Sequence, residues 1–172
     1  VVMSALEHIV FRYRTEAGDV DLFAEIKHMH DKLWPGLLQL YTYTYGLIPQ
    51  ALQQGNQPEL RQLLTLYTSL VEIFHSMNAQ DVAAFVQENT TAWFEPMLTI
   101  AGALPSSALT ERTEQNPTPI ENAKAAVCSV FRLFTDRYED VLSDSAIAIS
   151  KMDKGTQAAN RAAIIAARGG GN

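Results

Sequence analysis

The sequence predicts an all-α protein. Apolar residues recur at i, i+3, i+4 and i+7 along most of the 172-residue chain, which is the pattern of helices that bury one face. No segment shows the sustained alternation of apolar and polar residues, rich in β-branched side chains, that marks a half-buried strand. Signals for the start of a helix also precede two of the apolar stripes. We therefore expect helices and no sheet.

The first stretch, up to about residue 53, predicts two helices with a break at 15–20. The second helix carries an apolar stripe composed of Leu22, Ile26, Met29 and Leu33. Pro35 interrupts the pattern, and a proline inside a helix removes a backbone donor and clashes with the preceding turn. We expect this helix to run to about Trp34 and then to kink, or to stop and restart toward Leu52.

The second stretch, from about 58 to 103, predicts another pair of helices. Pro58 stands at the start of an apolar stripe, where proline is well tolerated. The stripe consists of Leu60, Leu63, Leu64, Tyr67, Leu70, Val71 and Phe74. A second helix is expected from about Asp81 to Ala103, with a kink at Pro96.

The third stretch, from about 118 to 152, begins with a capping box. In residues 118–121 (TPIE) the Thr hydroxyl and the Glu carboxylate can each accept a backbone N–H that the first turn leaves unpaired. An apolar stripe follows, composed of Ile120, Ala123, Val127, Val130, Phe131, Phe134 and Tyr138. We expect Phe74 and Phe134 to be buried anchors between helices.

Three helix pairs in succession, at about 1–53, 58–103 and 118–152, predict one domain of the α-solenoid class, built from HEAT-like antiparallel helix pairs. The first helices of the pairs begin roughly 60 residues apart, which is longer than the ~40–47 residues of a typical repeat. Residues 105–117 are dense in Ser, Thr, Pro and Asn and are expected to form a linker. Residues 153–172 have a small apolar face and are expected to be a divergent tail.

Composition and charge limit the classes of partner. Hydrophobic residues make up 47% of the chain and charged residues 19%, as in a packed globular protein. The net charge of −6 argues against binding of nucleic acid, which needs clustered Lys and Arg, and leaves room for a basic protein partner. No run of 18 or more uncharged apolar residues is present, so we expect no membrane insertion. Because the chain begins without Met inside an amphipathic pattern, we expect a fragment of a longer protein.

Two Glu-x-x-His motifs are the strongest hint of an enzyme. They are residues 25–28 and 72–75, and two helices of a four-helix bundle contribute such motifs to a di-iron or di-manganese site, with Glu7 and Glu121 as candidate further ligands. At ~100° per residue, however, Glu72 lies roughly 140° from the centre of its apolar stripe. Ligands of an internal site cannot lie on outer faces. A di-metal enzyme is therefore a minor alternative, and we expect no metal site.

No other pattern points to catalysis. Cys128, the only cysteine, stands among apolar residues and is expected to be a small buried thiol. Residues 41–45 (YTYTY) cover the whole circumference of a helix and are expected to combine aromatic packing with exposed hydroxyls. The sequence contains no glycine-rich phosphate-binding loop and no serine nucleophile elbow. We expect no catalytic residue and no cofactor.

Four blocks of the chain resemble the exportin-2 (importin-α re-exporter) family, in the family's order and with similar spacing. They are residues 8–14 (HIVFRYR), 22–27 (LFAEIK), 74–89 (FHSMNAQDVAAFVQEN) and 133–141 (LFTDRYEDV). The third block is the most telling of the four. The chain also departs from the family: Ala83 and Ala84 stand where the family has Pro-Glu, the loop at 104–117 lacks the family's acidic insert, and no match is evident beyond Ser143.

The resemblance implies a segment of a nuclear export receptor, a coil of HEAT repeats that shuttles between nucleus and cytoplasm and binds importin-α together with RanGTP. It implies no enzymatic activity and no cofactor. The second helices of a solenoid face its concave side, so we expect partner contacts on about 35–53 and 81–103. Within the latter, Asp81, Glu88 and Glu95 suit a basic partner. A generic helical protein-binding scaffold without a role in nuclear transport is the main alternative.

Overall fold

The structure is a computed structural model that describes residues 20–79, 81–109, 117–152 and 156. Within 20–30 it describes the backbone and, of the side chains, only that of His28. The expected helix before residue 15 and nearly all of the expected tail lie outside the described residues. The elements in chain order are α2 (Val20–Gln53), α3 (Gln57–Asn78), α4 (Ala84–Glu88), α5 (Thr90–Ala103), the 3-10 helix η1 (Ser106–Ala108), α6 (Pro119–Arg137) and α7 (Glu139–Lys151).

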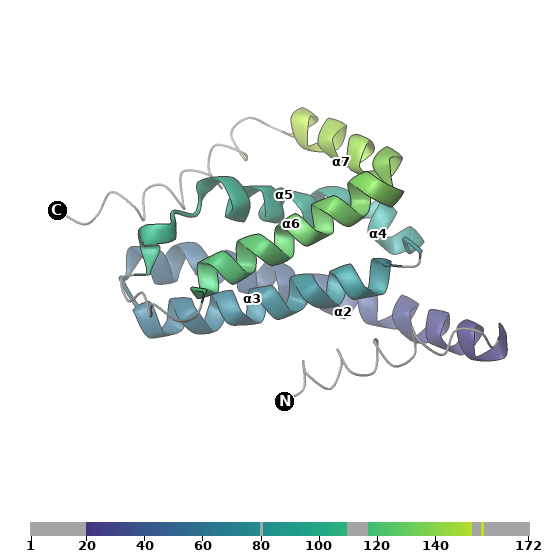
Figure 1. The fold of residues 1–172 in the computed structure, drawn as a ribbon, viewed down its shortest axis with the longest axis horizontal. Coiled ribbons are helices and arrows are strands. Elements are labelled where there is room, and N and C mark those ends of the chain that lie inside the picture. The colour runs from purple at the N-terminus through teal and green to yellow at the C-terminus, as the bar shows by residue number, and fades with distance from the viewer. Residues whose placement is uncertain (1–19, 80, 110–116, 153–155, 157–172) are drawn as a thin grey trace.

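The helices pack in two layers (Figure 1). Layer A consists of α3 and α6, which lie side by side and form the most extensive helix–helix contact in the described part of the chain. Layer B consists of α2, α4, α5 and α7, with α5 in contact with both α2 and α7. The two helices of layer A run opposite to α2, α5 and α7 (Figure 1). This arrangement confirms the predicted all-α class of antiparallel helix pairs.

Local signals in the sequence set the helix ends. Gly55 adopts a left-handed conformation (φ 63°), and the N–H of Gly55 and that of Asn56 donate to the carbonyls of Leu52 and Ala51 at 3.1 and 3.0 Å, which is a Schellman motif that ends α2. The predicted capping box starts α6: the Thr118 hydroxyl accepts from the N–H of Glu121 at 3.2 Å, and the Glu121 carboxylate accepts from the N–H of Thr118 at 2.8 Å.

An aromatic cluster joins the two layers. Phe74 of α3 lies within 4.6–6.1 Å, between ring centroids, of Trp34 of α2, Trp93 and Phe94 of α5, and Phe134 of α6. All five side chains are at most 1% exposed. The predicted anchors Phe74 and Phe134 are thus confirmed as buried contacts between helices. Every residue of the stripe predicted for α3 is also buried.

Helix α2 continues through Pro35 instead of ending near Trp34. Pro35 itself is exposed, whereas Trp34, Leu37 and Tyr41 on either side of it are buried. A proline inside a helix costs about 3 kcal/mol, but burial of each large apolar side chain contributes about 1.5–3 kcal/mol. Packing against the rest of the core therefore outweighs the local preference. Pro49 lies within the same helix.

Two further expectations are corrected. The helix expected from Asp81 to Ala103 is divided into α4 and α5, because Asn89 between them has non-helical angles (φ −117°, ψ 26°). Pro96 lies inside α5 and is buried. Cys128, expected to be buried, is exposed. It follows Val127 of the buried stripe by one residue, and a step of ~100° per residue turns its thiol out of the core.

Candidate functional site

Layer B carries the exposed large apolar side chains of the described part of the chain. Tyr43 of α2 is 66% exposed, Leu98 of α5 is 46% exposed and Ile147 of α7 is 50% exposed, and Leu40 of α2 stands one turn before Tyr43. Single exposed apolar residues are common on monomers. Here α2, α5 and α7 of one layer each contribute at least one, which makes this layer the candidate surface for contact with another protein.

The charges of layer B are also unbalanced. Among the side chains that the structure describes, layer B has six acidic residues and two basic ones, namely Asp31, Glu88, Glu95, Glu139, Asp140 and Asp144 against Lys32 and Lys151. Layer A has four of each, namely Glu59, Glu72, Glu121 and Asp136 with Arg61, Lys124, Arg132 and Arg137. A negative layer of this kind attracts a basic partner and speeds its association.

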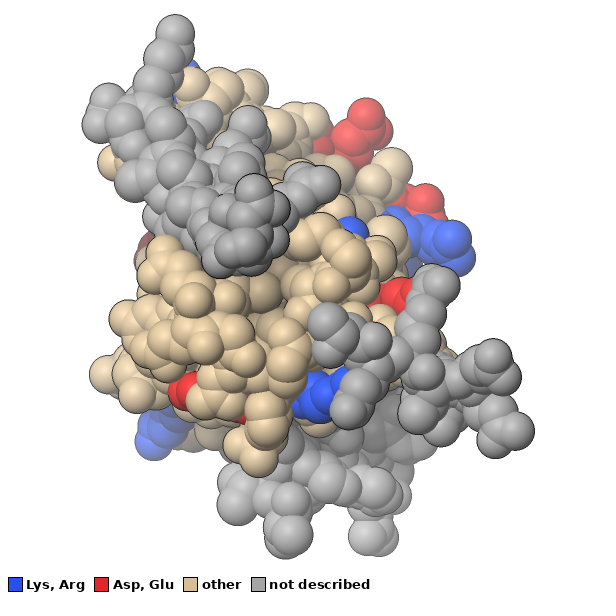
Figure 2. All heavy atoms as spheres, turned by 90° about the vertical axis from the view of Figure 1, so that its left-hand side faces the viewer, with Lys and Arg blue, Asp and Glu red and all other residues tan. Residues whose placement is uncertain are grey.

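Positive side chains do not gather at the end of the molecule where α2 turns into α3. Figure 2 looks onto this end, and Lys and Arg lie scattered there among other residues and beside Asp and Glu. A nucleic-acid site needs a continuous basic patch, and the described residues on the face in view form none.

Glu95 lies at the contact between α2 and α5. The Thr99 hydroxyl donates to the backbone carbonyl of Glu95 at 3.0 Å and lies 3.3 Å from the Glu95 carboxylate, and the Glu95 side chain is half-buried. Burial raises the pKa of nearby Tyr45 to about 12; the Thr99 hydrogen bond opposes that shift, and the Glu95 charge adds to it. Leu98 follows Glu95 by three residues, so the two share a face of α5. The predicted Glu95 is therefore beside the exposed apolar residue of its helix.

Asp81 and Glu88 lie elsewhere on the molecule. Asp81 is exposed in the loop between α3 and α4 and lies near Tyr138, where α6 ends. Burial raises the pKa of Tyr138, and the charge of Asp81 raises it further, while Arg137 opposes both. Glu88 is exposed at the end of α4. Asp81 and Glu95 thus have different neighbours, and the structure does not bring the three predicted residues into one cluster.

Sequence reasoning missed the apolar and acidic residues of α7, including Asp144 and Ile147. Their positions relative to Leu98 depend on how α7 packs on α5, which the local pattern does not reveal. For Leu98 of α5 one signal was available. It follows Met97, which is buried, by one residue, and a step of ~100° turns its side chain out of the core.

A buried hydrogen-bond network holds α5 in place. The Tyr41 hydroxyl of α2 donates to the carbonyl of Trp93 in α5 at 2.9 Å, and its oxygen lies 3.1 Å from the Tyr67 hydroxyl of α3. Because Tyr41 has a single proton, Tyr67 must donate to Tyr41. Burial raises the pKa of both phenols. This contact between three helices positions Glu95 and Leu98, which follow Trp93 on the same helix.

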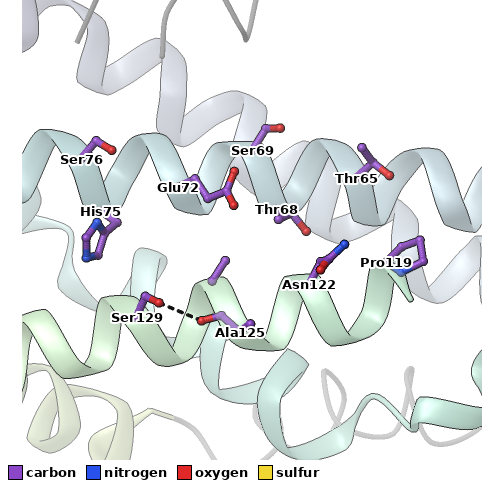
Figure 3. A pocket seen from close by; sticks show the side chains of 11 residues that line it. Thr65, Thr68, Ser69, Glu72, His75, Ser76, Pro119, Asn122, Ala125 and Ser129 are labelled. Carbon is purple, nitrogen blue, oxygen red and sulfur yellow. Dashed lines mark hydrogen bonds between the residues drawn. The ribbon is translucent and has the colours of Figure 1, made fainter. Parts of the chain in front are cut away.

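The residues of the metal hypothesis do not form a centre in the described part of the chain. Glu72 is exposed and His75 is half-buried, both on the groove between α3 and α6 (Figure 3). Glu121 accepts the N–H of Thr118 as a helix cap. The structure describes neither Glu7 nor the side chain of Glu25. No three His, Cys, Asp or Glu side chains that the structure describes are grouped as metal ligands.

No described helix has the length and apolar character of a membrane span.

Comparison with known proteins identifies similar sequences. The family model Cse1 matches residues 9–150. The importin-alpha re-exporter of Schizosaccharomyces pombe is 25% identical over 142 residues, which cover 83% of this chain and 14% of that protein. Exportin-2 of Danio rerio is 28% identical over 140 residues, and exportin-2 of Homo sapiens 26% over 134 residues; each alignment covers 77% of this chain and 14% of the relative. The chain therefore spans about 14% of the length of these relatives. No solved structure matches it.

Proposed function

The chain belongs to the Cse1 family, and from this premise we propose that it is a segment of a nuclear export receptor that binds importin-α together with RanGTP. Its relatives are named exportin-2 and importin-alpha re-exporter, which are names of transport proteins and not of enzymes. Because the chain spans about 14% of their length, it would supply one part of the partner surface. A receptor of this kind shuttles between nucleus and cytoplasm.

The observation that carries the proposal is the surface of layer B. Apolar side chains from α2, α5 and α7 lie on a layer with six acidic and two basic described residues. Apolar groups contribute affinity when a partner removes them from water. The acidic groups around them contribute mainly to the association rate and to the choice of a basic partner.

On this layer and in the loop that joins α3 to α4 we propose two kinds of contact. Tyr43, Leu98 and Ile147 would supply the apolar contacts, since each is at least 46% exposed. Asp81, Glu88 and Glu95 would supply acidic contacts to a basic surface of importin-α. Because these three residues are separated, we favour several contacts at different places and not one charged pocket. Glu95 would act together with Leu98.

Binding of importin-α to the full-length protein in the presence of RanGTP tests the apolar contacts. Changing Tyr43, Leu98 and Ile147 together to Ala should weaken binding by about tenfold or more, measured by calorimetry. The three side chains are exposed, so the fold should persist, as thermal unfolding can verify. A matched control changes two layer A residues, the half-buried Lys124 and the exposed Arg132, to Ala and should leave the affinity unchanged.

A charge test addresses the acidic contacts. Changing Glu88 and Asp81 to Lys should reduce the association rate with importin-α, and the difference from wild type should shrink as salt rises. Unaltered rates at low salt would remove these two residues from the contact. A full-length protein that binds helical partners, but neither importin-α nor RanGTP, would instead support a generic scaffold.

A further inference from the structure

Layer A has a groove that the proposed partner surface on layer B does not use. The groove lies between α3 and α6, and its cavity has a volume of about 590 Å³. Figure 3 shows side chains of both helices along its two walls, with Thr68, Glu72 and His75 on the α3 side and Asn122 and Ser129 on the α6 side.

Three hydroxyl groups of this groove, those of Thr65, Thr68 and Ser129, use their protons within their own helices. The Thr65 hydroxyl donates to the carbonyl of Arg61 at 2.8 Å, and that of Thr68 donates to the carbonyl of Leu64 at 2.8 Å. The Ser129 hydroxyl donates to the carbonyl of Ala125 at 3.1 Å. Each hydroxyl has one proton and two lone pairs, so these three oxygens turn only lone pairs toward a ligand.

The charge of the groove also favours a ligand that donates hydrogen bonds. Glu72 stands on its α3 wall (Figure 3), and among the residues that the structure describes no Lys or Arg lines this cavity. A carboxylate has about four acceptor positions, so Glu72 can accept from a ligand in addition to its neighbours in the protein. Hydroxyl lone pairs beside a carboxylate match the donors of an ammonium or guanidinium group.

The α6 wall leaves room for a backbone. Ala125 and Ala126 contribute methyl groups where longer side chains would obstruct the groove. A second cavity of about 370 Å³ shares His75 and Ser129 and extends toward the end of α6. Arg132, Arg137 and Asp136 line it, so a second cation would be repelled there by two guanidinium groups.

We propose that this groove binds an extended peptide segment of a partner protein through one Lys or Arg side chain. The cationic group would lie against Glu72 and the hydroxyl oxygen of Thr68, which is one helical turn before it. The small residues of α6 would accommodate the peptide backbone. This site is separate from the layer B surface and takes a different part of a partner, a single basic side chain and not a large apolar face.

An NMR titration of the full 172-residue chain tests the site, with the peptide Gly-Ser-Gly-Lys-Gly-Ser-Gly as the probe. The expected result is a set of shift changes in the amides of α3 and α6 around Glu72 and Ser129. The same peptide with norleucine in place of Lys should produce none, because it lacks the charge. Equal shifts with both peptides, or shifts confined to α2, α5 and α7, would overturn the proposal.

Variants separate this site from the proposed function. Glu72→Gln removes the charge and should weaken the lysine peptide about tenfold, and Ala125→Leu should block the groove while preserving a good helix former. Both positions are exposed, so both variants should fold. Asp144→Asn in layer B removes the same charge away from the groove and should leave peptide affinity unchanged. Affinity unaltered by both groove variants contradicts the site, whatever the outcome for importin-α.

Discussion

The phenyl ring of Phe74 in α3 stacks on that of Phe134 in α6, with ring centroids 5.9 Å apart and an interplanar angle of 17°. Both side chains are at most 1% exposed. The pair lies in the contact between the two helices of layer A, and each ring also touches Phe94 of α5 in an edge-on arrangement. These three rings therefore connect consecutive helix pairs of the chain.

Replacing either ring should destabilise the fold strongly. Phe74→Ala or Phe134→Ala is expected to lower the free energy of unfolding by roughly 3–5 kcal/mol, because each leaves a cavity in a closely packed core. The double variant should cost less than the sum of the two, with a coupling of roughly 0.5–1.5 kcal/mol for an aromatic pair. Urea unfolding measures all three values. A loss below about 1 kcal/mol for either single variant would contradict the assigned contact.

Tyr41→Phe should cost about 1–3 kcal/mol, although it removes a single oxygen atom. The Tyr67 hydroxyl would lose its acceptor and remain buried, and the carbonyl of Trp93 would lose a donor. Tyr67→Phe should cost less, since Tyr41 would still donate to Trp93. Denaturant unfolding of the two variants side by side checks this order, and a reversed order would mean that the network is assigned wrongly.

Stability should fall as the pH rises above about 10. Burial raises the pKa of Tyr45 from 10.0 to about 12 and also raises the pKa values of Tyr41 and Tyr67. The unfolded chain releases these protons near pH 10.0, whereas the folded chain retains them. Their stabilising contribution is therefore complete below that pH and is lost as the pH rises through the folded-state values, from about 10 to 12 for Tyr45. Unfolding free energies across this range should decline less steeply in the double variant Tyr41→Phe/Tyr67→Phe.

Thr118→Ala should destabilise α6 by about 1 kcal/mol, because it removes the oxygen that accepts the N–H of Glu121. Thr135→Ala is the matched control. Thr135 is exposed in the same helix and its hydroxyl bonds only to the carbonyl one turn earlier, so this change should be nearly neutral. Equal midpoints of thermal unfolding for the two variants would argue against the cap.

Cys128 should react readily with an aromatic disulfide reagent in the native protein, since its side chain is exposed. One thiol per chain is expected to react, at a rate that changes little when denaturant is added. A thiol that reacts only after unfolding would place Cys128 in the core, as its apolar sequence neighbours had suggested.

The candidate site was predictable only in part. Glu88 and Glu95 could be assigned to the second helix of a pair, because the order of helices follows from apolar stripes and start signals. The exposure of Tyr43, Leu98 and Ile147 on helices of one layer could not be predicted. These residues are on α2, α5 and α7, and the distances between them depend on contacts such as that between Tyr41 and Trp93, which are 52 residues apart in the chain.

The sequence by itself determined the helical class, the buried stripe of α3 and the capping box of α6. These features depend on neighbours within four residues, and the helical repeat makes such neighbours visible in the sequence. Tertiary structure decided that α2 continues through Pro35 and that Asp81 lies near Tyr138 and not near Glu95. Both features depend on the packing of side chains that are distant in the sequence, and the local pattern of residues does not contain that information.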